Sequence, residues 1–318
     1  MEYTGLIFAL FATISWSLGI FPFTQGARRL GVNELNHFRL LLATIVIGIV
    51  SFIVAPESFV ELFSSDYLTA WIWLGLSGLI GLSIGDHFGF AMYAILGPRL
   101  GSVLTTFAPA AALLLGSLLL SENISMLGII GMSITIIGVI TISLGKSERD
   151  LVPDHGHGSI AKGVLFGILA ALCQGAGLVL AKKGMLSEYM FHHSVHPVHA
   201  TFIRLLTGTL ILHILTLIRG KIVPVYTPVL KNQNNGIRYA MLGTFFGPVF
   251  GVTMSIYAVS RIDASVAQTI FSLVPVAAII LTYFRHHEKI SLKSMTGVLV
   301  ALLGVFILIW RDKLIQLF

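Results

Sequence analysis

Residues 85–138 read GDHFGFAMYAILGPRLGSVLTTFAPAAALLLGSLLLSENISMLGIIGMSITIIG. Landmark residues of this stretch return 166 positions later without a gap: Gly85 as Gly251, Pro109 as Pro275, Glu122 as Glu288, Gly131 as Gly297 and Gly138 as Gly304. A constant offset that keeps five pairs in register indicates an internal duplication. We therefore predict that the chain consists of two copies of one unit.

The composition is that of a membrane protein. Hydrophobic residues make up 56% of the 318 and charged residues only 11%, whereas soluble domains average about 25% charged. The mean hydropathy is +0.91. A span needs about 20 apolar residues, and we find ten such runs, at residues 5–23, 36–54, 70–94, 102–120, 124–144, 160–181, 198–218, 237–259, 263–284 and 292–310. The prediction is an all-α polytopic membrane protein with ten transmembrane helices.

The repeats divide the chain at a polar segment. We assign residues 1–145 to the first repeat, 146–161 to a connecting loop and 162–318 to the second repeat. Each repeat holds five spans, and because five is odd, the second repeat must enter the membrane from the opposite side. The sequence thus predicts two inverted five-helix repeats, an arrangement found in many secondary carriers.

Each repeat carries a proline inside an apolar run. Pro109 and Pro275 each remove a backbone hydrogen bond, which bends or breaks a helix. A broken span survives in a bilayer only where it is buried or lines a cavity, and paired breaks in two repeats point to a transporter's binding site. We expect both prolines to face a common central cavity.

The ordered landmarks resemble a known family. Trp16, Arg39-Leu40-Leu41, Pro109, Glu122, Gly131 and Gly138, and in the second copy Arg204, Pro275, Glu288, Gly297 and Gly304, resemble the drug/metabolite transporter superfamily and, within it, the EamA-type carriers of ten spans. The resemblance implies transport of a small metabolite or drug, with no enzyme activity and no cofactor. The sequence departs from the pattern at Gln174, where a tryptophan is expected, and in an insertion at residues 186–199.

One acidic residue lies well inside a span. Asp86 is followed directly by His87, and an ionisable group at the bilayer centre costs about 2.5–3.5 kcal/mol on insertion scales, which makes it a functional candidate. An acid beside a base could bind and release a proton. Helical spacing places Phe90 and Tyr93 on the face of Asp86. The alternative is that Asp86 only pairs with a neighbour and holds helices together.

Residues that differ between the repeats are the candidates for substrate or proton binding, because shared residues serve what both copies do. They are Asp86 and His87 opposite Val252 and Thr253, Trp16 opposite Gln174, and Ser102 opposite Gln268, together with Tyr93 and Tyr257. A plainer reading makes Trp16 a core or interfacial aromatic. The two glutamines could equally hydrogen-bond across helices.

The paired cations and acids of the repeats suggest anchoring. Arg39 and Arg204 stand at the entry of a span, where a long side chain can reach the membrane interface, and we favour anchoring over binding of an anionic substrate. Glu122 and Glu288 fall in short turns and are expected to be solvated or to cap helices. The glycine pairs on spans five and ten predict close helix packing.

A histidine-rich loop is the one local cluster with metal-ligand chemistry. It contains His192, His193, His196 and His199, while Asp154, His155 and His157 lie in a different loop. Structural zinc sites want four ligands in closed geometry, so we expect a solvated loop without a metal. A divalent-metal carrier is the alternative that this cluster leaves open.

The distribution of charge indicates which partners the protein contacts and how it is oriented in the membrane. The net charge is +6, but the cations lie in short loops between spans, so we expect the lipid bilayer and no nucleic acid as partner. Counting loops in alternation gives 13 cations on one face against five on the other, and the positive-inside rule then places both termini outside the cell membrane. The chain is expected to be a monomer, with a homodimer left open.

These observations favour a secondary transporter of a small polar metabolite that works by alternating access and is driven by protons or by exchange. We find no nucleotide-binding fingerprint in the sequence. Outside transport, an intramembrane enzyme using Asp86 and His87 as acid and base is the competing hypothesis, although no convincing set of catalytic partners accompanies them. The identity of the substrate is not encoded in any motif that we find.

Overall fold

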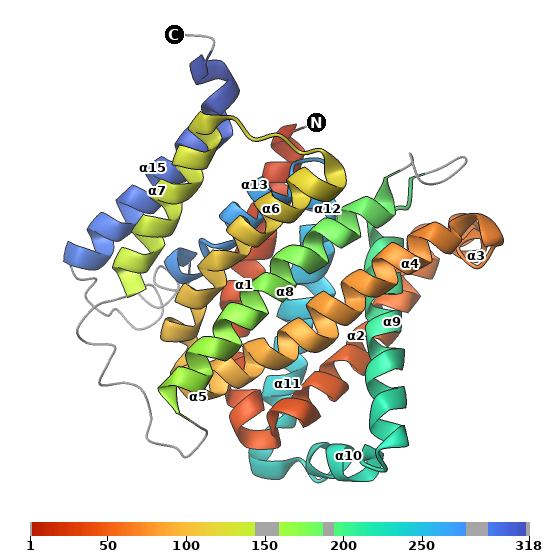
Figure 1. Cartoon of the computed structure of the whole chain (residues 1–318). Helices are drawn as coiled ribbons and strands as arrows, with labels where there is room; N and C mark the ends of the chain where they lie inside the picture. The colour runs from red at the N-terminus through yellow and green to blue at the C-terminus, as the bar shows by residue number, and fades with distance from the viewer. Residues whose placement is uncertain (1, 144–158, 187–193, 278–291, 316–318) are drawn as a thin grey trace.

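A computed structural model describes residues 2–143, 159–186, 194–277 and 292–315, and this part of the chain is built from helices joined by short turns (Figure 1). The first repeat contains α1 (Glu2–Leu30), α2 (Val32–Val54), α3 (Pro56–Glu61), η1 (Ser65–Tyr67), α4 (Leu68–Ser77), η2 (Gly78–Gly85), α5 (Asp86–Leu104), η3 (Thr105–Phe107), α6 (Ala108–Leu120) and α7 (Met126–Ser143). The second contains α8 (Ile160–Met185), α9 (Pro197–Ile218), α10 (Ile222–Leu230), η6 (Gln233–Asn235), α11 (Ile237–Thr244), η7 (Phe245–Val252), α12 (Thr253–Val259), α13 (Ala264–Phe271) and α15 (Leu292–Ile315).

Six helices in the described residues are long and apolar enough to cross a membrane: Tyr3–Leu30, Val32–Val54, Ser65–Gly97, Ile160–Met185, Pro197–Ile218 and Gln233–Val259. Four shorter apolar helices, Thr105–Leu120, Met126–Thr141, Ala264–Ala277 and Met295–Arg311, coincide with the remaining apolar runs. The prediction of an all-helical membrane fold is confirmed for the described residues. Of the ten predicted spans, six are helices of spanning length and four are shorter, so the count of ten stays a prediction.

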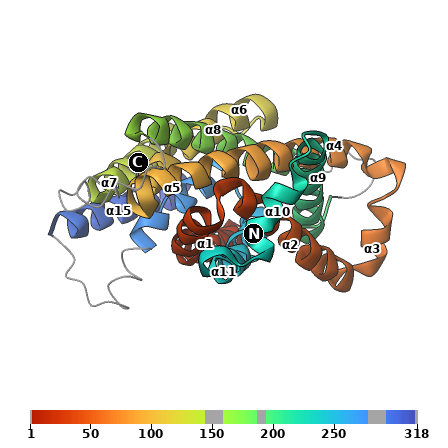
Figure 2. The same cartoon turned by 90° about the horizontal axis from the view of Figure 1, so that it is seen from below.

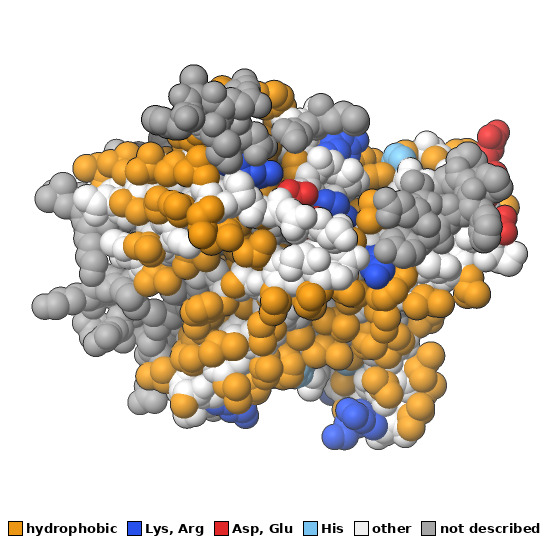
Figure 3. Space-filling view, turned by 45° about the horizontal axis from the view of Figure 1, so that its top comes forward, with side chains coloured by type: hydrophobic (Ala, Val, Ile, Leu, Met, Phe, Trp, Pro, Cys, Tyr) orange, Lys and Arg blue, Asp and Glu red, His pale blue; other side chains and the backbone are white. Residues whose placement is uncertain are grey.

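The outer surface suits a lipid environment. Large apolar side chains such as Ile53, Leu118 and Leu217 are more than half exposed. Figure 3 shows hydrophobic side chains spread over much of the visible face, with charged side chains in a small group at its upper centre and at its edges. Exposed apolar area on this scale is unfavourable in water, and it suits contact with lipid tails.

The third long span of each repeat is interrupted at matching positions by a π-helical segment. The segments are η2, with the sequence GLIGLSIG, and η7, with the sequence FFGPVFGV. Glycines weaken the α-helical preference in η2, and Pro248 in η7 cannot donate a backbone hydrogen bond. Such π-turns occur frequently at functional sites.

The two repeats interlock at these segments. Helix α8 of the second repeat packs on η2, where a Cβ on Gly177 would lie 2.9 Å from the Cα of Gly81. Helix α1 of the first repeat packs on η7, where a Cβ on Gly251 would lie 2.5 Å from Nε1 of Trp16. The first helix of each repeat thus contacts the broken span of the other, and the backbones come close because glycine leaves room.

The last helices of the repeats, α7 and α15, form a separate layer at one side of the molecule (Figures 1 and 2). A Cβ on Gly138 would lie 2.3 Å from the backbone nitrogen of Ala301, and one on Gly304 would lie 2.4 Å from that of Thr135. A Cβ on Gly131 would likewise lie too close to the carbonyl oxygen of Gly304. The predicted glycine-mediated packing of spans five and ten is therefore confirmed.

Candidate functional site

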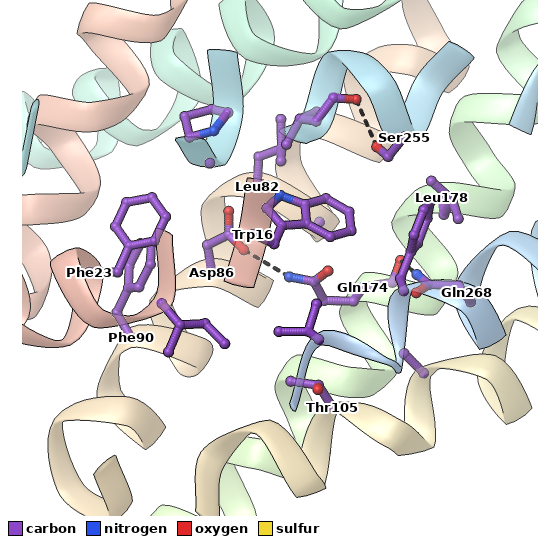
Figure 4. A pocket seen from close by; sticks show the side chains of 18 of the residues that line it. Trp16, Phe23, Leu82, Asp86, Phe90, Thr105, Gln174, Leu178, Ser255 and Gln268 are labelled. Atoms are coloured by element: carbon purple, nitrogen blue, oxygen red, sulfur yellow. Dashed lines mark hydrogen bonds between the residues drawn. The ribbon is translucent and has the colours of Figure 1, made fainter. Parts of the chain in front are cut away.

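A cavity of about 140 Å³ lies where the broken spans of both repeats meet (Figure 4). Its walls come from α1, α2, η2, α5, η3 and α6 of the first repeat and from α8, α9, η7, α12 and α13 of the second. Among the predicted site residues, seven line it: Trp16, Arg39, Asp86, Tyr93, Gln174, Arg204 and Gln268. The structure therefore brings together residues far apart in the sequence.

The π-helical segments supply backbone acceptors at this site. In η2 the carbonyl oxygen of Leu82 accepts a hydrogen bond from Nη2 of Arg39 at 2.8 Å, and that of Ser83 accepts one from Nδ2 of Asn36 at 3.1 Å. In η7 the carbonyl oxygen of Phe246 accepts a hydrogen bond from Ser15 Oγ at 2.6 Å. Since a buried carbonyl without a partner is costly, these side chains stabilise the breaks.

Asp86 is held on both sides of its carboxylate. Nη2 of Arg39 forms an ion pair with Oδ2 of Asp86, and Nε2 of Gln174 donates to Oδ1 at 2.9 Å. Arg39 is 2% exposed, receives further orientation from Asn36 Oδ1 at 3.0 and 3.1 Å, and lies 4.9 Å from the centre of the Phe90 ring. The result is a buried, fixed ion pair at the wall of the cavity.

The prediction that Arg39 and Arg204 reach the membrane interface is wrong. Both side chains line the central cavity, and Arg204 is 4% exposed. They point inward because α2 and α9 pack against each other, α9 packs against η2, and α2 packs against α5 and η7, so that the face carrying the arginines is enclosed. Nε and Nη1 of Arg204 have no hydrogen-bond partner among the described residues.

The two glutamines form a ladder across helices, as the plainer sequence interpretation anticipated. Gln174 reaches from α8 to Asp86, and Nε2 of Gln268 in α13 donates to the carbonyl oxygen of Gln174 at 3.2 Å. Trp16 meets Phe271 edge to face at 4.9 Å. The side chains of Gln174, Gln268, Trp16 and Phe271 pack against their neighbours and also line the cavity, where a ligand can contact them.

Two of the candidates lie elsewhere. His87 is outside the cavity wall, where its ring lies beside Phe88, and the ion-pair partner of Asp86 is Arg39. The anticipated Asp86–His87 pair is therefore not formed, because adjacent residues on a helix point to different sides. Tyr257 also lies outside the cavity and stacks on Phe8 at 5.1 Å. The side chain of Ser102 is outside the described residues.

Both prolines follow a helix break, but neither lines the cavity. Pro109 is in the first turn of α6, directly after η3, and Pro275 follows a turn at residues 272–273 after α13. The adjacent Ala108 and Val274 line the cavity instead. A proline is tolerated in the first turn because its missing N–H has no helical partner there. Each proline therefore marks the start of the helix that follows the break.

The histidines near the insertion correct another expectation. His199 is 1% exposed, with Nδ1 at 2.6 Å from Ser51 Oγ and Nε2 at 2.9 Å from Ser58 Oγ. The solvated loop is thus wrong for His199, which fastens α9 to α2 and α3. Burial, with a smaller effect of Arg261, lowers the pKa of His196. His192 and His193, together with Asp154, His155 and His157, lie outside the described residues.

Glu122 caps a helix but is not solvated. Its carboxylate accepts hydrogen bonds from the backbone N–H of Ala264 at 3.1 Å and from Nζ of Lys182 at 2.6 Å, and the residue is 8% exposed. The capping half of the expectation holds and the solvated half is wrong. Lys182 also lies 3.7 Å from Asp263, which in turn lies 3.5 Å from Arg311. Glu288 lies outside the described residues.

Several residues of the cavity wall were not predicted from the sequence. Pro248, Ser255 and Ser272 line it, and Asn36 orients Arg39 from one helical turn away. Asn36 could have been found, since a buried arginine needs acceptors and the i−3 position faces it. Pro248 could have been found as a second proline in an apolar run.

Comparisons with known proteins agree with this architecture. The model of the EamA-like transporter family matches residues 3–144 and 161–310, one match for each repeat. A solved structure described as "Crystal structure of protein" superposes with a TM-score of 0.71 at 12% identity, covering 99% of this chain and 100% of the other, and this likeness concerns the fold alone. No curated protein matches. The two family matches, which cover nearly the whole chain, show that the protein belongs to the EamA-like transporter family.

Proposed function

We propose that this protein is a secondary transporter that moves a small polar metabolite across the cell membrane by alternating access. The observation that carries the proposal is the cavity at the crossing of the two repeats, which joins charged side chains to the breaks of both third spans. Substrate sites of secondary transporters lie at such repeat interfaces. Each repeat is then one of the two bodies that rock about the site.

The proposed moving parts are residues 1–145 and 162–318, with ten spans in all and the second half inverted relative to the first. The reciprocal packing of α1 on η7 and of α8 on η2 supports this proposal. We further propose that both termini face outward, on the distribution of loop cations. A reporter fused after Phe318 tests the orientation, and a cytoplasmic signal from it contradicts this assignment.

Coupling is proposed to involve Asp86, the one carboxylate among the described residues that line the cavity. If proton binding to Asp86 drives transport, Asp86→Asn should abolish uphill transport while substrate counterflow persists, because the amide keeps the size but cannot change charge. Uphill transport at the wild-type rate and pH dependence would instead favour exchange. Counterflow measured in the same proteoliposomes controls for folded protein.

We propose no enzymatic activity. Asp86 is held by Arg39 and Gln174 and is separated from His87, so the acid and base of the competing hypothesis do not face one another. Proteoliposomes loaded with a candidate metabolite decide between the two. A transporter releases the metabolite unchanged, whereas a converted product recovered from the vesicles would overturn this proposal.

A further inference from the structure

The cavity carries one more positive charge than its described wall residues neutralise. Arg39, Arg204 and Asp86 are the charged side chains that line it. Asp86 is already engaged, since Oδ2 is paired with Arg39 and Oδ1 accepts from Gln174. Arg204 is 4% exposed, and its Nε and Nη1 have no partner among the described residues. Asp86 also interacts electrostatically with Arg204, but one carboxylate neutralises only one of the two guanidinium groups, and an unbalanced buried charge is strongly unfavourable.

The duplication explains why this charge is unbalanced. Arg39 and Arg204 occupy matching positions on α2 and α9, but the position that matches Asp86 is Val252, which lines the same cavity. The first repeat therefore contains its own counterion, whereas the second presents the same cation beside an apolar side chain. A site of this kind is complete only when a ligand supplies the missing negative charge.

Resting on the proposed function, we propose that the transported substrate is a small monocarboxylate whose anionic group binds Arg204 and whose apolar body packs against Trp16 and Phe271. A guanidinium binds carboxylates in a directional, charge-assisted manner. A phosphate monoester carries about −1.5 to −2 and would exceed the single uncompensated charge. An apolar cavity of about 150 Å³ accommodates benzene, so the space here, about 140 Å³, suits one ring or a short aliphatic chain.

The test compares matched ligand pairs on the purified wild-type protein. Thermal unfolding in detergent is followed with benzoate, phenylacetate, 3-methylbutanoate and hexanoate, each beside its primary amide, and with phenyl phosphate. Because a bound ligand stabilises the folded state, at least one carboxylate should raise the melting temperature while its amide does not. Equal shifts for acid and amide, no shift with any carboxylate, or a larger shift with phenyl phosphate would overturn the proposal.

Variants assign the charge to Arg204. Arg204→Gln should weaken binding of the best carboxylate by at least about tenfold, as the loss of a charge-assisted hydrogen bond predicts, whereas Arg238→Gln, at an exposed arginine, should bind as the wild type does. If Arg204→Gln does not fold, Val252→Asp serves instead, because it places a carboxylate in the cavity and should abolish the carboxylate-induced shift. Unchanged binding in either folded variant would refute the role of Arg204.

Binding and transport fail separately. If carboxylates bind but proteoliposomes do not move them, binding of the anionic group to Arg204 stands, whereas the proposal that a carboxylate is transported fails. If vesicles transport a neutral or cationic solute through this protein while carboxylates neither bind nor compete, the proposed function stands and the inference is overturned.

Discussion

The α7–α15 layer and the crossing of α1, α8, η2 and η7 are both contacts between the repeats that use glycine for close approach, yet only the crossing encloses the charged side chains of the cavity. In the α7–α15 layer the two repeats contribute the same residue type, glycine, and the contact is backbone against backbone. At the crossing the repeats contribute different residues, such as Asp86 and Val252, and the contact encloses charge. The comparison indicates that matched residues build the scaffold, whereas the site combines the matched pair Arg39 and Arg204 with unmatched residues such as Asp86 and Val252.

The largest effect is expected in the α7–α15 layer. Gly138→Val puts a branched side chain where even a Cβ would lie 2.3 Å from a backbone nitrogen of α15, so two backbones must separate and we expect no folded protein. Overpacking commonly costs about 1–3 kcal/mol and more where backbone must move. Size-exclusion chromatography and thermal unfolding measure the outcome. Gly89→Ala is the control, since its nearest neighbour beyond the local helix is an alanine Cβ at 3.9 Å.

The next effect is expected at the crossing. Asp86→Ala leaves Arg39 buried without its counterion, which should lower the free energy of unfolding by about 3–5 kcal/mol. Asp86→Asn keeps a hydrogen-bond acceptor for Arg39 and should lose less. Denaturation of the solubilised variants checks the order. Equal stability of Asp86→Ala and the wild type would mean that the ion pair contributes nothing to the fold.

Glu122 sharpens the comparison, because glutamate occurs at its matching position and the rule assigns it to the scaffold. Glu122→Gln weakens a buried charge-assisted contact with Lys182 and should cost about 1.5–3 kcal/mol of stability. The specificity for ligands of the central cavity should be unchanged in the same variant. Ligand-induced shifts in melting temperature, recorded for the panel above, would reveal any altered preference.

His199 tests the limit of the rule, since it lies in the insertion of the second repeat and yet it serves packing. His199→Ala leaves Ser51, which is fully buried, without this partner and should cost about 1–3 kcal/mol. His192→Ala with His193→Ala is the comparison pair in the same stretch of sequence and should leave stability unchanged. A reversed order of these two variants would restore the idea that the histidines act as one group.

Much of the fold could be predicted from the sequence, because hydropathy and the duplication are one-dimensional signals. Ten apolar runs and the 166-residue offset suffice for the helical, two-repeat architecture. The π-helical segments could not be predicted, since their glycines are equally typical of close packing. The burial of Arg39 and Arg204 was missed because an arginine at the start of an apolar run resembles an interfacial anchor until its acceptors in another span are known.

Part of the site could also be predicted from hydropathy, because polar residues inside apolar runs are visible in the sequence. Asp86, Gln174 and Gln268 stand out as polar residues inside spans, and the structure places all three at the cavity. His87 and Tyr257 share that signal but contact other neighbours, Phe88 and Phe8. Only the packing of the broken spans determines which polar residues meet.

The placement of the Arg39–Asp86 pair has a consequence for biosynthesis. Both partners belong to the first repeat, so a ribosome completes the pair before the second repeat exists, and the nascent half can enter the bilayer with these two charges mutually neutralised. Arg204 is synthesised later and becomes buried only when α9 packs against the spans of the first repeat. Assembly of this protein should therefore be sensitive to the order of synthesis, and exchanging the two repeats in the gene should impair insertion even though every residue is retained.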